Sequence, residues 1–436
     1  MKPMVKAATM VGLLFVAAAS IHCSPFGGAS EFACTDDVQC QAQGGAGRCE
    51  ATGFCSFPDE SCGPGGSRYG ELAGGLSNQC VNGEPPPDGP GPEPDGPPPD
   101  PEDECFGTTG GLVEPCFAPD DKPTGAVTLT TDIDTDASSL CSSTVKNTTA
   151  CVVAGGTISI SNGVSVRATG NKPLVLLATT GAITIDGTLD VASHVNFPNA
   201  VVPAAASNFA GCDAGTLPNN GGGGAGGSFG TQGGNGGIGR NVAASNGVAG
   251  AAQVPTALRG GCKGQDGNGA ANFGVGGDGG GAVYLIAETA INIGGTGVIN
   301  ASGAGATDGF VGGSVGGGGG GSGGLIGLDA PAIANAGNVF ANGGGGGEAS
   351  GGSNPNTRQL AFCGADPVGI GPAPGGNGGT TNGGNGGAGA ANTANGTNGQ
   401  NNPGGASGGG GGGGGGVGVI KVFGGTLGGN RSPAPT

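Results

Sequence analysis

The sequence predicts an all-β protein whose main domain, residues 152–436, is a parallel β-helix (β-solenoid) with glycine-rich loops able to pack as polyglycine II. Three observations predict it. Glycine supplies 109 of the 436 residues, and because glycine costs much backbone entropy and buries no side chain, an ordinary helical core is excluded. Apolar and polar residues alternate strictly on both sides of an Asn-Gly turn at 158–166. The same pattern returns at 183–191, as expected for a stacked repeat.

The N-terminus has the features of an export signal, which we assign to residues 1–22. Lys2 and Lys6 precede a short apolar run, residues 10–19, that is too short to span a bilayer. Ordinary cleavage after the alanines at 17–19 is one possibility. Lipidation of Cys23 is the other, although His22 is not the small residue that a lipoprotein signal has before its cysteine. Membrane attachment is expected only through such an anchor.

The fourteen cysteines indicate an oxidising compartment, where disulfides replace core burial. Residues 34–81 form a Cys-rich module in which six cysteines should pair among themselves, with 15 connectivities open. Residues 105–151 form an entry segment with four more, which should also pair internally. Three stay unresolved, so one must be free or pair elsewhere, for example with Cys23. The groups are Cys34, Cys40, Cys49, Cys55, Cys62 and Cys80; Cys105, Cys116, Cys141 and Cys151; and Cys212, Cys262 and Cys363.

Residues 82–104 are predicted to be an acidic, proline-rich linker. Prolines set a polyproline geometry there, and the interspersed carboxylates repel one another. We expect a stalk that separates the Cys-rich module from the remaining chain.

Further copies of the repeat occur later in the chain. The inward pattern recurs in residues 291–301 and, with a polar residue inside, in 333–341. Continuous apolar runs, typical of strands buried on both faces, come before the copies or at the chain's end: 174–178, 283–287, 325–328 and 417–423. Between them lie glycine-rich segments, for which two interpretations remain open: flexible loops, or extended polyglycine helices packed together.

The sequence offers little catalytic chemistry. With 14 Lys and Arg and a formal charge of −17, the chain lacks the cationic surface that nucleic acids require. Apart from His22 there is only His194, for which we expect a turn position; one histidine cannot form a two-histidine metal site. Asp186 and Asp190 should point outward, away from any second carboxylate. We therefore predict no catalytic residues, no metal site and no cofactor.

The segment from Cys34 to Val81 (CTDDVQC…GRCEATGFCSFPDESC) resembles a cysteine-rich module that heads many myxobacterial surface proteins. The segment from Cys151 to Ser193 (CVVAGGTISISNGVSVRATG…), with the glycine-rich blocks after it, is similar to glycine-rich, solenoid-like bacterial surface proteins. The resemblance implies an exported, surface-associated protein, either an outer-membrane or cell-surface lipoprotein or a secreted chain. It implies no particular ligand.

The function expected from the sequence is that of a non-catalytic structural or adhesive surface protein, acting in surface contact or matrix assembly. Its partners would be polysaccharide or other surface proteins. Two alternatives remain: a polysaccharide lyase or hydrolase built on a β-helix, and a largely disordered glycine-rich surface polymer.

Overall fold

The computed structural model describes residues 33–41, 46–62, 66–70, 73, 76–77, 79–81, 103–196, 200–269, 272–310, 314–351, 362–378, 383–403 and 407–436. The export signal, Cys23 and most of the expected linker lie outside these residues. The chain divides into two compact units, Met1–Pro94 and Asp95–Thr436. None of the helices in the described residues is long and apolar enough to cross a membrane.

The first unit is small and cross-linked. A four-residue helix begins after Asp36, whose carboxylate caps it by accepting from the amides of Val38 and Gln39. An antiparallel sheet of order β1-β2-β3 follows, and three disulfides join its parts. The elements are α1 (Asp37–Cys40), β1 (Arg48–Cys49), β2 (Cys55–Pro58), the 3-10 helix η1 (Glu60–Cys62) and β3 (Ser67–Tyr69).

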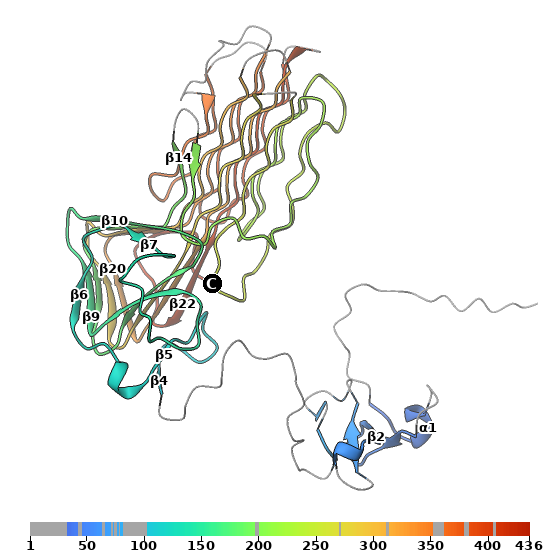
Figure 1. Ribbon diagram of the computed structural model, residues 1–436. Helices are drawn as coiled ribbons and strands as arrows, with labels where there is room; N and C mark the ends of the chain where they lie inside the picture. Colours follow the sequence, from blue (N-terminus) through green and yellow to red (C-terminus); the bar gives the residue numbers. More distant parts are fainter. Residues whose placement is uncertain are drawn as a thin grey trace, which may run out of the picture. The chain divides into compact units, whose positions relative to one another are not determined.

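Three parallel sheets, with strands drawn from both ends of the unit, form one part of the second unit (Figure 1). The first has the order β22-β19-β16-β11-β8, the second β20-β17-β12-β9-β6 and the third β23-β21-β18-β13-β10-β7. Their strands are, sheet by sheet, β22 (Val419–Gly424), β19 (Leu325–Ala330), β16 (Ala282–Ala287), β11 (Leu174–Ala178) and β8 (Cys151–Gly155); β20 (Ala332–Asn335), β17 (Ala290–Ile293), β12 (Ile183–Ile185), β9 (Thr157–Ile160) and β6 (Ala126–Thr128); β23 (Asn430–Ser432), β21 (Asn338–Phe340), β18 (Val298–Asn300), β13 (Thr188–Asp190), β10 (Ser165–Thr169) and β7 (Ile133–Asp134).

Two strand pairs and a 3-10 helix of the second unit lie outside these sheets. β4 (Glu104–Cys105) pairs with β5 (Cys116–Phe117), and β14 (His194–Asn196) pairs with β15 (Ala200–Val202), both antiparallel. A 3-10 helix, η3 (Pro119–Asp121), follows β5.

The repeat seen in the sequence appears as strand register. Ile183 of β12 is aligned with Ile158 of β9 on one side and with Ile291 of β17 on the other, and Leu189 of β13 is aligned with Val166 of β10. These side chains are fully buried in one apolar core that the three sheets share. The side-chain period of two in a strand explains why the alternating residues face this core.

The continuous apolar runs belong to the first sheet, which is buried on both faces. In β11, Leu174 and Leu176 pack into the shared core, whereas Val175 and Leu177 pack into a second apolar cluster. That cluster also contains Phe106 and other residues of the segment that covers the sheet. A strand covered on both sides needs apolar residues at every position.

The predicted β-solenoid over residues 152–436 is wrong. The protein is all-β with parallel sheets, but the sheets are not arranged as a closed solenoid. The segments 203–281, 301–324 and 341–418 leave the sheets and contain no strand among their described residues. Figure 1 shows them as long traces, side by side, extending from the sheets. Since glycine has no side chain to fill a core, these segments are stabilised by backbone hydrogen bonds among themselves instead. We call their described residues the glycine bundle.

Hydrogen bonding in the glycine bundle has a period of three residues, the period of the polyproline II conformation. The central segment 408–416 shows it most fully. Its amides at 410, 413 and 416 donate to the segment 221–227, those at 411 and 414 to 397–400, and those at 412 and 415 to 344–347. Its carbonyls accept from three other segments: 234–240, 317–323 and 384–390. The central segment thus has six neighbours, and every carbonyl from 408 to 416 and every amide from 409 to 416 is hydrogen-bonded.

The glycine bundle leaves no room for side chains at its centre. A Cβ added at Gly412, Gly413 or Gly415 would lie 1.8–2.1 Å from a backbone carbonyl oxygen of a neighbouring segment. Glycine is therefore required there by close approach of the backbones. The described glycine segments are packed together, which answers the question that the sequence left open.

Candidate functional site

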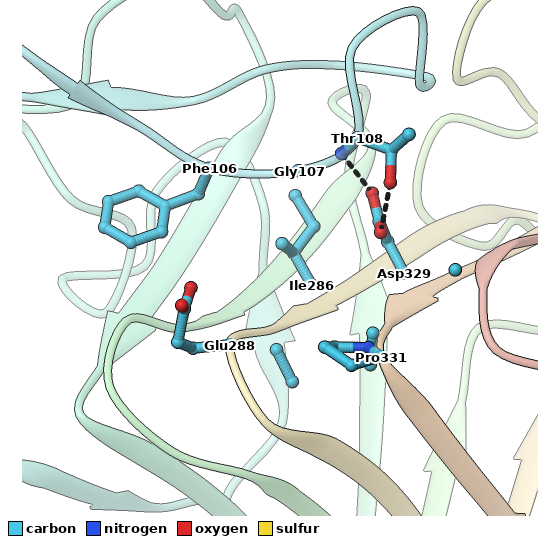
Figure 2. A pocket seen from close by; sticks show the side chains of 10 residues that line it. Phe106, Gly107, Thr108, Ile286, Glu288, Asp329 and Pro331 are labelled. Atoms are coloured by element: carbon cyan, nitrogen blue, oxygen red, sulfur yellow. Dashed lines mark hydrogen bonds between the residues drawn. The ribbon is translucent and has the colours of Figure 1, made fainter.

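A cleft lies at the carboxyl ends of β16, β19 and β22. Its volume is about 250 Å³, and it is lined on one side by the segment that follows β4. Figure 2 shows Phe106 and Glu288 at one end of the cleft, Thr108 and Asp329 at the other, and Ile286 between them. The disulfide between Cys105 and Cys116 closes the covering segment on itself.

Asp329 is the most constrained polar group of the cleft. Its side chain is buried, and three neutral donors hold it. Thr108 N donates to Oδ2 at 2.6 Å and Thr108 Oγ1 donates to Oδ1 at 2.8 Å (Figure 2). The Tyr284 hydroxyl also donates to Oδ2, at 2.6 Å. Burial, and next the hydrogen bond to the Asp329 carboxylate, raise the pKa of the Tyr284 phenol well above its usual range. Asp329 thus fixes the covering segment onto β19.

The chemistry that this cleft can perform is limited by those bonds. A paired-carboxylate hydrolase needs two acids that are both able to act on the substrate. Here Asp329 is already occupied by Thr108 and Tyr284, whereas Glu288 is exposed. No Lys, Arg or His is among the residues that line the cleft, so its charge favours a small neutral or cationic molecule over an anion.

A second polar cluster surrounds His194, which lies in β14 and not in the expected turn. Its Nε2 lies 2.8 Å from Oδ2 of Asp190, and its Nδ1 lies 3.2 Å from Oδ2 of Asp366. Hydrogen bonds to Asp190 and then Asp366 raise the pKa of His194 to about 9. At neutral pH the imidazole is therefore a cation between two carboxylates.

This histidine cluster joins the sheets to the glycine bundle. Asp366 also accepts from the amides of Val195 and Gly305, and Asp190 accepts from the amide of Ala192. With both ring nitrogens of His194 engaged, the group is suited to holding segments together and not to proton transfer to a substrate.

The edges of the glycine bundle are capped by amide side chains. Where a segment has no neighbour to receive its N–H groups, an Asn or Gln side chain accepts them: Asn398 Oδ1 from Asn235 N at 2.8 Å, and Asn401 Oδ1 from Ile238 N at 2.9 Å. Asn235 and Gln265 act in the same way on Ala249 N and Ala225 N. These caps satisfy donors that the bundle edge would leave open.

The cysteines form six disulfides in the described residues, which makes both units disulfide-rich. Three join members of the first group, two join members of the second, and the sixth lies in the glycine bundle. The pairs are Cys34–Cys49, Cys40–Cys55, Cys62–Cys80, Cys105–Cys116, Cys141–Cys151 and Cys212–Cys262. Cys363 belongs to none of them; its buried thiol lies 3.7 Å from Oδ1 of Asp308. Cys23 lies outside the described residues.

Several residues of these sites were not identified from the sequence. Asp329 and Asp366 reach their partners only through folding, since Thr108 and His194 are far from them in the chain. The caps Asn398 and Asn401 did have a sequence signal: they belong to a run in which asparagine occupies every third position, at 392, 395, 398 and 401, which matches the three-residue period.

Comparison with known proteins adds no relative: no family model, no curated protein and no solved structure matches this chain.

Proposed function

We propose that this chain is an exported, non-catalytic surface protein whose glycine bundle serves as a rigid structural or adhesive element. The observation that carries the proposal is the central segment 408–416, whose backbone is hydrogen-bonded to six neighbours without any side chain between them. Such a body places backbone and small polar groups at fixed positions on its surface, which suits contact with extended surfaces better than it suits catalysis.

Export is supported by cysteine chemistry. Six disulfides form and persist in oxidising compartments and are rare in reducing ones. The apolar run at 10–19 and the basic residues before it supply a matching signal. If Cys23 is lipidated, residues 82–104 would hold the second unit away from the membrane.

Adhesion of coated beads tests the function. Beads carrying the oxidised chain should bind to bacterial cell surfaces or extracellular matrix, and beads carrying a Gly413→Val variant, which breaks the bundle, should not. Equal binding by both would contradict a role for the bundle. Release of reducing or unsaturated sugar products from a glycan panel would favour the enzyme alternative.

Localisation is tested separately. In a host that processes the signal, the chain should be accessible to protease on intact cells, and a labelled fatty acid should enter the native protein but not Cys23→Ala. Label that persists in Cys23→Ala would remove the lipid anchor. A chain that stays reduced in the cytoplasm would contradict export.

A further inference from the structure

One edge of the glycine bundle carries a regular row of asparagines. Asn395, Asn398 and Asn401 lie on the extended segment 394–403, all exposed, at successive three-residue intervals. In a polyproline II segment that interval is roughly 9 Å. We call these three residues the amide row.

The orientation of the row is set by the caps. Because Oδ1 of Asn398 and of Asn401 accept N–H groups from the segment 232–238, the Nδ2 groups of these two amides remain available as donors. The backbone N–H and C=O of all three row residues have no partner among the residues that the structure describes. At Asn398 and Asn401 the row therefore offers amide and backbone donors and a backbone acceptor in a fixed arrangement, and Asn395 adds a backbone donor, a backbone acceptor and an amide that no cap engages.

The bundle around the row carries little charge, although the chain as a whole is strongly acidic. Residues 383–403 and 231–239 contain no Asp, Glu, Lys, Arg or His, and a single exposed cation, Arg240, follows at one end of the row. A polyanion would find only this one cation along these segments, and a cationic partner would find no carboxylate. The exposed neighbours of the row on its own segment are small or polar, namely Ala394, Thr397, Gln400 and Pro403, so the large apolar and aromatic anchors of a protein–protein interface are missing from this segment.

We propose that the amide row binds a neutral, hydroxyl-rich polysaccharide that lies along segment 394–403. Sugar hydroxyls both donate and accept, which matches the amide donors and backbone carbonyls of the row. Each contact is weak by itself. Repeated contacts along a rigid edge raise the overall affinity, because once the first contact is made the second and third are intramolecular. This inference rests on the proposed adhesive function and names its ligand class.

The decisive variant keeps the caps and removes the donors. In Asn398→Asp/Asn401→Asp, a carboxylate oxygen still accepts from Asn235 N and Ile238 N, but the outward amide donors are replaced by negative acceptors. Asn268→Asp is the matched control, since Asn268 Oδ1 caps Gly221 N and, within the described residues, no backbone hydrogen bond joins its segment 260–269 to 394–403. Asn395→Asp is a second variant; the Asn395 side chain caps no described residue.

Binding is measured by co-sedimentation of the full oxidised chain with insoluble cellulose, chitin and β-1,3-glucan, and with pectate as a charged comparison. We expect binding to at least one neutral glycan, a loss of roughly tenfold in the double variant and a smaller loss in Asn395→Asp, with Asn268→Asp equal to native. Native-like binding by the double variant, equal losses in double variant and control, or preference for pectate would overturn the inference. Beads that adhere to cells while the chain binds no neutral glycan would overturn it and leave the proposed function standing.

Discussion

The amide of Gly413 donates a 2.9 Å hydrogen bond to the carbonyl of Gly224, and both lie on extended segments of the glycine bundle. Contacts of this kind, repeated every third residue, replace side-chain packing in this part of the protein. Their cost is that the backbones must approach closely, so the bundle depends on particular glycines.

Gly413→Ala should destabilise the protein strongly. The new Cβ would lie 2.1 Å from the carbonyl oxygen of Gly234, and a backbone atom held on several sides cannot move away. We expect a loss of about 3 kcal/mol or more in the free energy of unfolding, measured in urea. Gly295→Ala is the control, since a Cβ there meets nothing within 4 Å; it should change stability by less than about 1 kcal/mol. Equal effects would refute the close-approach explanation.

His194 should make stability depend on pH in a defined window. Its pKa is raised from 6.5 to about 9 in the fold, so the protonated form is favoured by folding. The stabilisation, about 2 kcal/mol once solvent screening of the partly exposed imidazole is allowed for, is complete below pH 6.5 and is lost as pH rises through 9. The melting temperature of native protein should exceed that of His194→Gln most at pH 6, and the two should converge by pH 10. A constant difference across this range would show that folding does not raise the pKa of His194.

Tyr284 should resist ionisation. The chain has two tyrosines, so Tyr69→Phe leaves Tyr284 as the only phenol. Burial and the Asp329 carboxylate raise its pKa, and we expect phenolate absorbance to stay absent well above pH 10 and to appear only with unfolding. Phenolate absorbance near pH 10 in folded protein would mean that Tyr284 is not buried against Asp329.

Removal of the Cys212–Cys262 disulfide should cost more than removal of Cys105–Cys116. The Cys212–Cys262 disulfide joins residues 50 positions apart in the sequence, whereas Cys105–Cys116 joins residues 11 positions apart. Loop entropy predicts losses of about 4 and about 3 kcal/mol for the double alanine variants. Chemical unfolding of both variants measures this. The reverse order would indicate that strain or residual structure, and not loop length, dominates.

The alignment of the strands could be predicted well from the sequence, because apolar and polar residues alternate with a period of two along a strand. The spacing between Ile158 and Ile183 predicted their alignment, and the structure confirms it. The continuous apolar run of β11 likewise predicted burial on both faces. Such patterns reveal which residues face a core, but they do not define how separate sheets are arranged, so the β-solenoid prediction failed.

The glycine bundle and the polar clusters were harder to predict for a physical reason. Hydrogen bonds between glycine backbones leave no side-chain pattern, so the six neighbours of 408–416 are invisible in the sequence. The contact of His194 with Asp366 joins elements that only the complete fold brings together. The three-residue spacing of asparagines at the bundle edge was the one sequence pattern that indicated the packing of the glycine bundle.

Amide hydrogen exchange over residues 408–416 tests the central claim most directly. If this segment is hydrogen-bonded on all sides in the interior of the bundle, its amides should exchange as slowly as those of the buried strand β16, through opening of the second unit as a whole. Exchange over 408–416 at the rate of an unstructured glycine chain, with β16 still protected, would contradict the account.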